Sequence, residues 1–327
     1  MPGTGITSNV VVVGSYVHDH VWLTERFPDT GETLGATGFA TGPGGKGFNQ
    51  AIACKRQGAA VTFVGSIGAD HLGAAAREFA LAEGLDCRWQ VCDGAPTAAA
   101  SIAVDASGAN RILVNFAANL HLDPAFVEAQ RELFESARVV LVQLENNLDA
   151  VRMALDLGAR HGLLRMLNPA PVHRDIDAAL LARCDLITPN ETEIALLLER
   201  VVGQHIRAAD VATLDDDRLH TLCRSLAVPT IIITLGAAGC FVSHGDDRRG
   251  DAVAHYRIAA EPVRAIDTVG AGDAFNGALA AAFAGDSSRP FRHAVMRANR
   301  VAAMSTEKIG AAIAMPMAAQ VDARFGS

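Results

Sequence analysis

The 327-residue sequence has no run of lysine or arginine, and its formal net charge is −8. Nucleic acids and anionic membrane surfaces attract proteins through clustered basic residues, so we expect neither as a partner. A basic leader is missing from the first nine residues, and the four valines at 10–13 are too few for a signal peptide or a membrane span. These absences predict a soluble, cytoplasmic protein that holds any anionic ligand through local groups.

The six cysteines form no CxxC pair and show no zinc-ligand spacing; they stand at positions 54, 87, 92, 184, 223 and 240. This pattern is typical of reduced, mostly buried thiols in a cytosolic protein. Internal repeats and low-complexity segments are also missing, and 50% of the residues are apolar. The length and composition therefore allow one large α/β domain or two small ones, with a sizeable core in either case.

The stretch AIDTVGAGDAFNGALAAAF, residues 265–283, joins two glycines to an alanine-rich helical segment. Gly270 and Gly272 allow the backbone N–H groups to converge on one point, which makes an anion cradle. Asp273 lies in the first turn, where the helix dipole favours an ionised carboxylate. A base beside an oxyanion site indicates phosphoryl transfer to a hydroxyl. The alternative is an ordinary helix with an acidic residue near its N-terminus.

Buried strands and helices alternate along most of the remaining chain. Residues 9–15, NVVVVGS, are typical of a parallel strand that is buried on both faces. Further strands are expected at 138–145, 163–167, 185–188 and 230–234, and helices at 123–137, 149–161 and 290–307, the last being the final helix. The pattern predicts a mostly parallel central sheet flanked by helices.

Two segments, at about 16–42 and 97–118, are short, punctuated by glycine and threonine, and weakly alternating. They predict hairpins that pair into a small β-sheet lid. Residues 17–20, Val-His-Asp-His, are expected in a polar loop beyond the first strand, where Asp19 would accept hydrogen bonds from sugar hydroxyls. The alternative of a metal held by the two histidines is disfavoured, because no further ligand cluster has a recognisable spacing.

Glycines at 42, 44 and 47 match GxGxxG, and Asp70 follows a strand-like segment, so a NAD-dependent oxidoreductase has to be weighed. We disfavour it because no buried strand precedes the first glycine. A Walker A loop is excluded as well, since Lys46 is followed by glycine where serine or threonine should bind magnesium.

Asn190 and Glu193 stand three residues apart at the start of a predicted helix. Such a pair can organise a hydrated magnesium ion, and the alternative is a helix cap with solvated acids. The turn from Gly236 to Gly239 follows a buried strand and allows a nucleotide to approach the backbone.

Together, five segments in order resemble the PfkB carbohydrate kinase family, most closely its ribokinase branch. They are GGKGFNQA (44–51), NPAP (168–171), ITPNETE (187–193), ITLGAAG (233–239) and DTVGAGDAFNGAL (267–279). The resemblance spans nearly the whole chain. It implies a single ribokinase-like α/β domain over residues 1–327, in which a β-sheet lid covers the sugar and ATP lies on the other side of the phosphoryl path. It also implies a homodimer formed through the lids.

The resemblance assigns roles by position. Asp273 would take the proton from the attacking hydroxyl, and the backbone of Gly270, Ala271 and Gly272 would form the anion hole. The implied sugar contacts are Asp19, Gly45, Lys46, Asn49, Glu145 and Asp273. The implied nucleotide and magnesium residues are Asn190, Glu193, Thr234, Gly236, Gly239, Gly272 and Asn299. A monovalent cation, usually potassium, would be held mostly by carbonyl groups at Asp267, Val269, Ser305, Lys308, Gly310 and Ala314.

The implied activity is transfer of the ATP γ-phosphoryl to the primary hydroxyl of a pentose, with ribose giving ribose 5-phosphate. Two departures from the family pattern put ribose in question. Val17 stands where a ribokinase typically has asparagine, and Phe48 replaces a small residue. A sugar that lacks a hydroxyl opposite Val17, or carries an apolar group there, is then favoured. The alternatives within the family are an adenosine or inosine kinase and a fructokinase.

Overall fold

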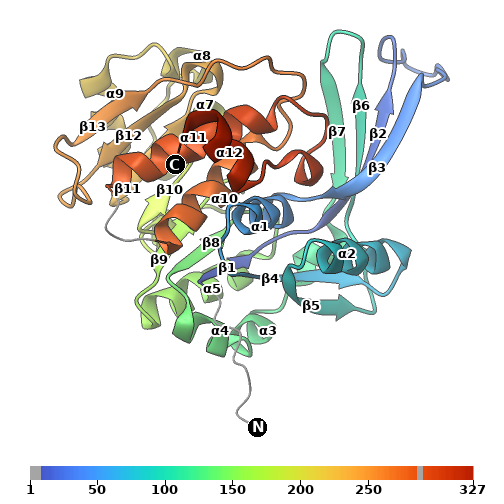
Figure 1. Ribbon diagram of the computed structural model, residues 1–327, viewed down its shortest axis with the longest axis horizontal. Coiled ribbons are helices and arrows are strands. Elements are labelled where there is room, and N and C mark those ends of the chain that lie inside the picture. Colours follow the sequence, from blue (N-terminus) through green and yellow to red (C-terminus); the bar gives the residue numbers. More distant parts are fainter. Residues whose placement is uncertain (1–8, 286–289, 327) are drawn as a thin grey trace.

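The four valines of β1 (Val10–Val13) lie at the centre of the molecule and are fully buried. In the computed structural model, which describes residues 9–285 and 290–326, β1 belongs to a nine-stranded sheet with the order β13-β12-β11-β10-β9-β8-β1-β4-β5 (Figure 1). Every pairing from β11 to β5 is parallel, whereas β12 and β13 join as antiparallel strands. The predicted mostly parallel sheet is therefore confirmed.

The strands of this sheet are β1, β4 (Val61–Gly68), β5 (Asp86–Cys92), β8 (Val139–Val142), β9 (Leu164–Leu167), β10 (Leu186–Ile187), β11 (Thr230–Thr234), β12 (Cys240–His244) and β13 (His255–Ile258). The longer helices are α1 (Lys46–Arg56), α2 (His71–Ala82), α5 (Leu148–Arg160), α7 (Glu191–Val202), α9 (Asp216–Ser225), α10 (Ala271–Ala284), α11 (Phe291–Ser305) and α12 (Ala318–Phe325). Short helices are α3 (Pro124–Glu128), α4 (Arg131–Ser136), α6 (Ala178–Leu181) and α8 (Ala208–Val211). No helix of the described ranges is both long and apolar enough to cross a membrane.

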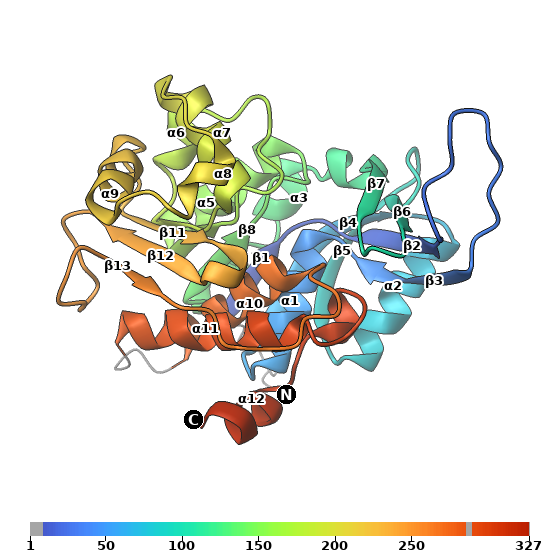
Figure 2. The ribbon, with the colours of Figure 1, turned by 90° about the horizontal axis from the view of Figure 1, so that it is seen from above.

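Side chains of β1 alternate between two separate cores because successive residues of a strand point to opposite faces. Val10 and Val12 belong to the core that includes α1, α10 and α11, and Val11 and Val13 belong to the core that includes α5 and α7. Figure 2 shows these two groups of helices on opposite sides of the sheet. Burial on both faces explains the uninterrupted valine run.

A second sheet of four strands stands beside the first, with the order β3-β2-β6-β7 (Figure 1). Its strands are β2 (Val17–Leu23), β3 (Gly38–Gly44), β6 (Ala99–Val104) and β7 (Asn110–Asn115). The predicted small lid sheet is confirmed, but the polar loop expected at residues 17–20 is wrong. These residues open β2, and both ring nitrogens of His18 lie within hydrogen-bond distance of hydroxyls, those of Tyr16 (3.0 Å) and Thr41 (2.7 Å).

Two other expectations need correction, and Asp70, which belonged to the disfavoured dinucleotide interpretation, has a structural role. The helix predicted over 123–137 is broken between α3 and α4, and Asp123 caps only α3 by accepting a hydrogen bond from the Ala125 N–H. The helix expected to be last, α11, is followed by α12. Asp70, weighed above as a cofactor residue, is the N-cap of α2 and accepts hydrogen bonds from Gly73 and Thr97.

Helices α1 and α10 cross at very short range, and Gly277 makes this possible. A Cβ atom built there would lie 2.4 Å from the Gln50 carbonyl oxygen and 2.6 Å from the Ala53 Cβ. Backbone cannot move away as a flexible side chain can, so any side chain at this position would push the helices apart. Because α1 carries Asn49 and α10 carries Asp273, this crossing also sets the relative position of the candidate site residues.

We predict that Gly277→Ala destabilises the protein by about 1–3 kcal/mol, the usual cost of overpacking. Urea unfolding would measure the change. Gly94→Ala is the matched control, since a Cβ at Gly94 meets no atom within 4 Å. Equal midpoints for the two variants would contradict the proposed tight crossing.

Candidate active site

Asp273 is buried in the first turn of α10, with 6% of its surface exposed. Its Oδ2 accepts a hydrogen bond from Asn49 Nδ2, and its Oδ1 accepts one from Gln50 Nε2, both at 2.9 Å. Burial raises the pKa of Asp273, while Lys46 and the two amide donors act in the opposite direction. The side chain is thus a carboxylate of enhanced basicity whose charged form is supported by two amide donors.

Two further carboxylates gather near Asp273. Glu145 Oε2 accepts hydrogen bonds from the Ser15 hydroxyl (2.5 Å) and from the Lys46 backbone N–H (2.9 Å). Burial, together with Glu145 and Asp273, raises the pKa of Asp19 to about 7. Asp19 fits beside β3 because residue 44 is glycine: a Cβ there would lie 2.1 Å from Asp19 Oδ2.

Lys46 supplies the positive charge for this acidic cluster. Burial acts to lower its pKa, but Asp273, Glu145 and Glu193 together hold the pKa above its ordinary value. The ammonium therefore stays charged and offsets the repulsion among the carboxylates.

A cavity of about 210 Å³ is lined by two of the predicted sugar residues, Lys46 and Asp273, and by four of the predicted nucleotide and magnesium residues, Asn190, Glu193, Thr234 and Gly272. The other predicted sugar residues, Asp19, Gly45, Asn49 and Glu145, are not among its lining residues. The walls of the cavity are formed by Lys46, Asn168, Ala170, Thr188, Asn190, Glu193, Thr234, Thr268, Gly270, Gly272, Asp273 and Asn276. The N-terminus of the 14-residue helix α10 opens into it, which places the positive end of the helix dipole beside Asp273. In the turn before the helix, the Ala271 N–H donates to the Thr268 carbonyl at 3.2 Å.

Asn190 and Glu193 form the capping box of α7. The Asn190 side chain accepts from the Glu193 N–H (2.9 Å), and Glu193 Oε2 accepts from the Asn190 N–H (2.8 Å). The capping alternative therefore holds for the structure. Both residues also line the cavity, so the cap leaves them in a position to meet a ligand. Burial raises the pKa of Glu193.

The other predicted nucleotide residues lie at the end of β11, in the turn after it and in the middle of α11. Thr234 lines the cavity and forms a β-bridge with Asn190. Gly239 packs against the backbone of residues 258–260, and Asn299 Nδ2 donates to the Ala259 carbonyl at 2.7 Å. Gly239 and Asn299 are thus joined through one backbone segment, although neither lines the 210 Å³ cavity.

Residues predicted to hold a monovalent cation come from two loops that Asp267 ties together. Asp267 Oδ1 accepts from the Val269 N–H (3.0 Å), and its Oδ2 accepts from the Gly310 N–H (2.9 Å). Gly270, at φ 78°, packs against Ala311. Of the other members, Ser305 and Ala314 are buried, whereas Lys308 is exposed.

Sequence reasoning assigned no role to several polar residues that the structure places around Asp273. These are Ser15, Gln50, Gln143, Asn168, Thr188 and Asn276. Four of them could have been found, because they stand inside the family motifs quoted above: Gln50, Asn168, Thr188 and Asn276. Gln143 had none, because its partner lies 93 residues away.

The two departures from the family pattern have different surroundings. Phe48 is fully buried in an aromatic cluster, with its ring 5.1 Å from Tyr16 and 5.5 Å from Phe63. Phe48 therefore contributes to core packing beside β2 and β4. Val17, 3% exposed, packs with Ala98 and other small apolar residues of the lid.

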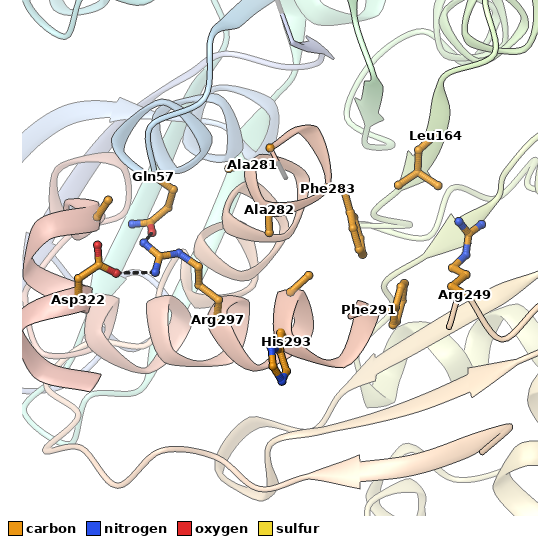
Figure 3. A pocket seen from close by; sticks show the side chains of 13 residues that line it. Gln57, Leu164, Arg249, Ala281, Ala282, Phe283, Phe291, His293, Arg297 and Asp322 are labelled. Carbon is orange, nitrogen blue, oxygen red and sulfur yellow. Dashed lines mark hydrogen bonds and ion pairs between the residues drawn. The ribbon is translucent and has the colours of Figure 1, made fainter. Parts of the chain in front are cut away.

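A larger cavity, of about 560 Å³, contains none of the predicted site residues (Figure 3). It lies at the far end of α10, where its lining residues from Ala281 to Gly285 are about 12–18 Å along the helix axis from Asp273. On one side Arg297 donates to Asp322 (2.6 Å) and Gln57 (2.9 Å), and on the other the Phe283 and Phe291 rings stack. The charged residues Lys46, Glu193 and Asp273 line the smaller cavity instead.

Residues 7–318 match the model of the pfkB family carbohydrate kinases. The chain is 34% identical over 308 residues to ribokinase of Haemophilus influenzae, covering 94% of this chain and 95% of that protein. It is also 31% identical over 295 residues to deoxyribokinase of Salmonella typhi, covering 88% of this chain and 90% of that one.

Among solved structures, the chain resembles Arabidopsis thaliana ribokinase complexed with ribose and ATP, with a TM-score of 0.80 and 26% identity over 96% of this chain and 97% of that one. The family model, the relatives and the shared fold lead to one conclusion: the chain belongs to the pfkB family of carbohydrate kinases.

Proposed function

We propose that this kinase transfers the γ-phosphoryl of ATP to the 5-hydroxyl of a pentose, with ribose as the first candidate. The observation that carries the proposal is the placement of Asp273, a buried carboxylate held by two amide donors at the N-terminus of α10. A base in this position can accept a proton while the adjacent helix end stabilises phosphoryl charge.

The proposed transfer makes one bond and breaks one. Asp273 takes the proton of the primary hydroxyl, the hydroxyl oxygen bonds to the γ-phosphorus, and the bond to the β-γ bridging oxygen breaks to release ADP. Phosphoryl transfer asks the protein mainly for positioning and charge stabilisation. Lys46, Gly270 and Gly272 line the same cavity and are suited to the second task.

Asp19, Gly45, Lys46, Asn49 and Glu145 are proposed to bind the sugar. Asn49 supports this assignment, because its Nδ2 donates to Asp273 while its buried Oδ1 has no partner among the described residues. A buried acceptor without a donor is costly, and a sugar hydroxyl would satisfy it.

The apolar surroundings of Val17 favour 2-deoxyribose as a second candidate. A valine offers no hydrogen bond to a hydroxyl, so a sugar without one at that position loses nothing. The 31% identity to a deoxyribokinase is compatible with this candidate. Adenosine or inosine and fructose are the remaining alternatives.

A coupled ADP-release assay over ribose, 2-deoxyribose, adenosine, inosine and fructose tests the substrate. We predict that Val17→Asn raises kcat/KM for ribose about 10-fold through one added hydrogen bond and leaves 2-deoxyribose unimproved. Val17→Ala is the control, since it changes size without adding a polar group. Turnover of fructose with no pentose accepted would refute the pentose assignment.

Asp273→Asn should lower kcat by about 10²- to 10⁴-fold, the usual contribution of a general base, with KM for the sugar nearly unchanged. Steady-state kinetics would measure both. Asp123→Asn is the matched control, because Asp123 caps α3 outside the site. A near-normal kcat for Asp273→Asn would remove the assigned base.

ATP is proposed to lie along Asn190, Thr234, Gly236, Gly239 and Asn299. Glu193 fits a hydrated magnesium ion, because it lines the same cavity as Lys46 and magnesium retains most of its waters in proteins. Magnesium would neutralise the developing charge on the phosphates.

A potassium ion is proposed between the two loops that Asp267 joins. Carbonyl groups at Val269, Ser305, Gly310 and Ala314, with the Asp267 carboxylate, are oxygen donors suited to such an ion. The packing of Gly270 against Ala311 supports this placement, because it links the loops to the start of α10.

Turnover should depend on this cation, since an ordered loop keeps the N–H groups of the anion hole directed at the phosphate. We expect potassium to activate more than sodium in the ADP-release assay. Equal activity after complete replacement of potassium by tetramethylammonium would exclude the cation site.

A homodimer formed through the lids is also proposed. Apolar side chains are exposed on the lid strands, among them Phe39 (58%) and Leu113 (78%). Such surface is typical of an interface.

A cytoplasmic location is also proposed. The six free cysteines, two of them only partly buried, favour a reducing compartment and hence the cytoplasm.

A further inference from the structure

A chain of buried side-chain amides leads from Gln143 through Gln50 to Asp273 and to Asn168, and of these amides Asn168 also lines the 210 Å³ cavity. Gln143 Nε2 donates to Gln50 Oε1 (2.6 Å), and Gln50 Nε2 donates to both Asp273 Oδ1 (2.9 Å) and Asn168 Oδ1 (3.0 Å). Asn168 Nδ2 then donates to the Thr188 carbonyl (2.9 Å). Gln50 and Gln143 have no exposed surface.

The direction of every bond in this chain follows from two fixed acceptors. The Thr188 carbonyl can only accept, so Asn168 must present its NH₂ group there and its oxygen to Gln50. An ionised Asp273 also can only accept, so Gln50 must present its NH₂ group to both. The Gln50 oxygen is then left facing Gln143, which supplies the donor.

We propose that Gln50, held in this orientation by Gln143, is a positioning residue that keeps Asp273 ionised and correctly rotated for proton transfer. The proposal rests on the assigned role of Asp273 as the base. If Gln50 turned its amide over, its oxygen would face Asp273 Oδ1 and Asn168 Oδ1, and three oxygens would meet without a proton. Gln143 opposes this rotation from a position that does not touch Asp273.

The backbone is shaped to admit Gln143. A Cβ at Gly14 would lie 2.3 Å from Gln143 Oε1, so a side chain at residue 14 would displace the amide. Gln143 Oε1 itself has no partner among the described residues. Only the Nε2 end of this amide is hydrogen-bonded, which is the end that orients Gln50.

The test is the pH dependence of kcat at saturating sugar and ATP, which reports the base in the bound complex. Gln50→Met keeps the length of the side chain and removes the donor to Asp273. The acid limb of its kcat–pH profile should move upward by about one pH unit, as expected for the loss of one charge-assisted hydrogen bond. The charged groups around Asp273, namely Lys46, Glu145, Asp19 and Glu193, remain in place.

Gln143→Met should move the acid limb in the same direction by a smaller amount, and KM for the sugar should stay within about threefold for both variants. If Gln50→Met fails to fold, Gln143→Met carries the test alone. Gln57→Met is the matched control. Gln57 follows the same helix, but it donates to the Pro316 carbonyl and is not part of the amide chain. Its acid limb should match that of the wild type.

Folded variants with a lower melting temperature but an unmoved acid limb would show that the amides serve packing alone, and the proposal would fail. Absence of ATP-dependent pentose phosphorylation in the wild type would instead refute the proposed function. The two failures are therefore distinguishable.

Discussion

The buried carboxylate of Asp273 is the constraint on which the site depends. A charge removed from water must be given donors or it is neutralised, and at this position only 6% of the residue's surface is exposed. The donors come from α1, whose consecutive residues Asn49 and Gln50 each bind one carboxylate oxygen. The close crossing at Gly277 brings these helices near enough for both bonds, so fold stability and catalytic geometry share one packing contact.

The parallel sheet explains why polar residues that are far apart in the sequence meet around Asp273. Ser15 follows β1, Gln143 and Glu145 follow β8, Asn168 follows β9, and Thr188 follows β10. The carboxyl ends of parallel strands lie at one edge of the sheet, which is where ligands bind in open α/β folds. The lid adds Asp19 from β2 across this edge.

Much of this arrangement could be predicted from the sequence. The valine run of β1, the glycines before Asp273 and the Asn190–Glu193 cap are local patterns, and each lies where local rules place it. The hydrogen bond from Gln143 to Gln50 could not be predicted, because it joins two side chains that are 93 residues apart in the sequence. The break between α3 and α4, and the antiparallel strands β12 and β13, were also missed, since tertiary packing overrides weak local propensity.

The central claim is that Asp273 faces the attacking hydroxyl at the N-terminus of α10. A structure of the complex with ribose and a non-hydrolysable ATP analogue tests it most directly. The account predicts the primary hydroxyl within about 2.6–3.2 Å of an Asp273 oxygen, with the γ-phosphate beside Gly270 and Gly272. A sugar bound with its primary hydroxyl directed away from Asp273 would contradict the account.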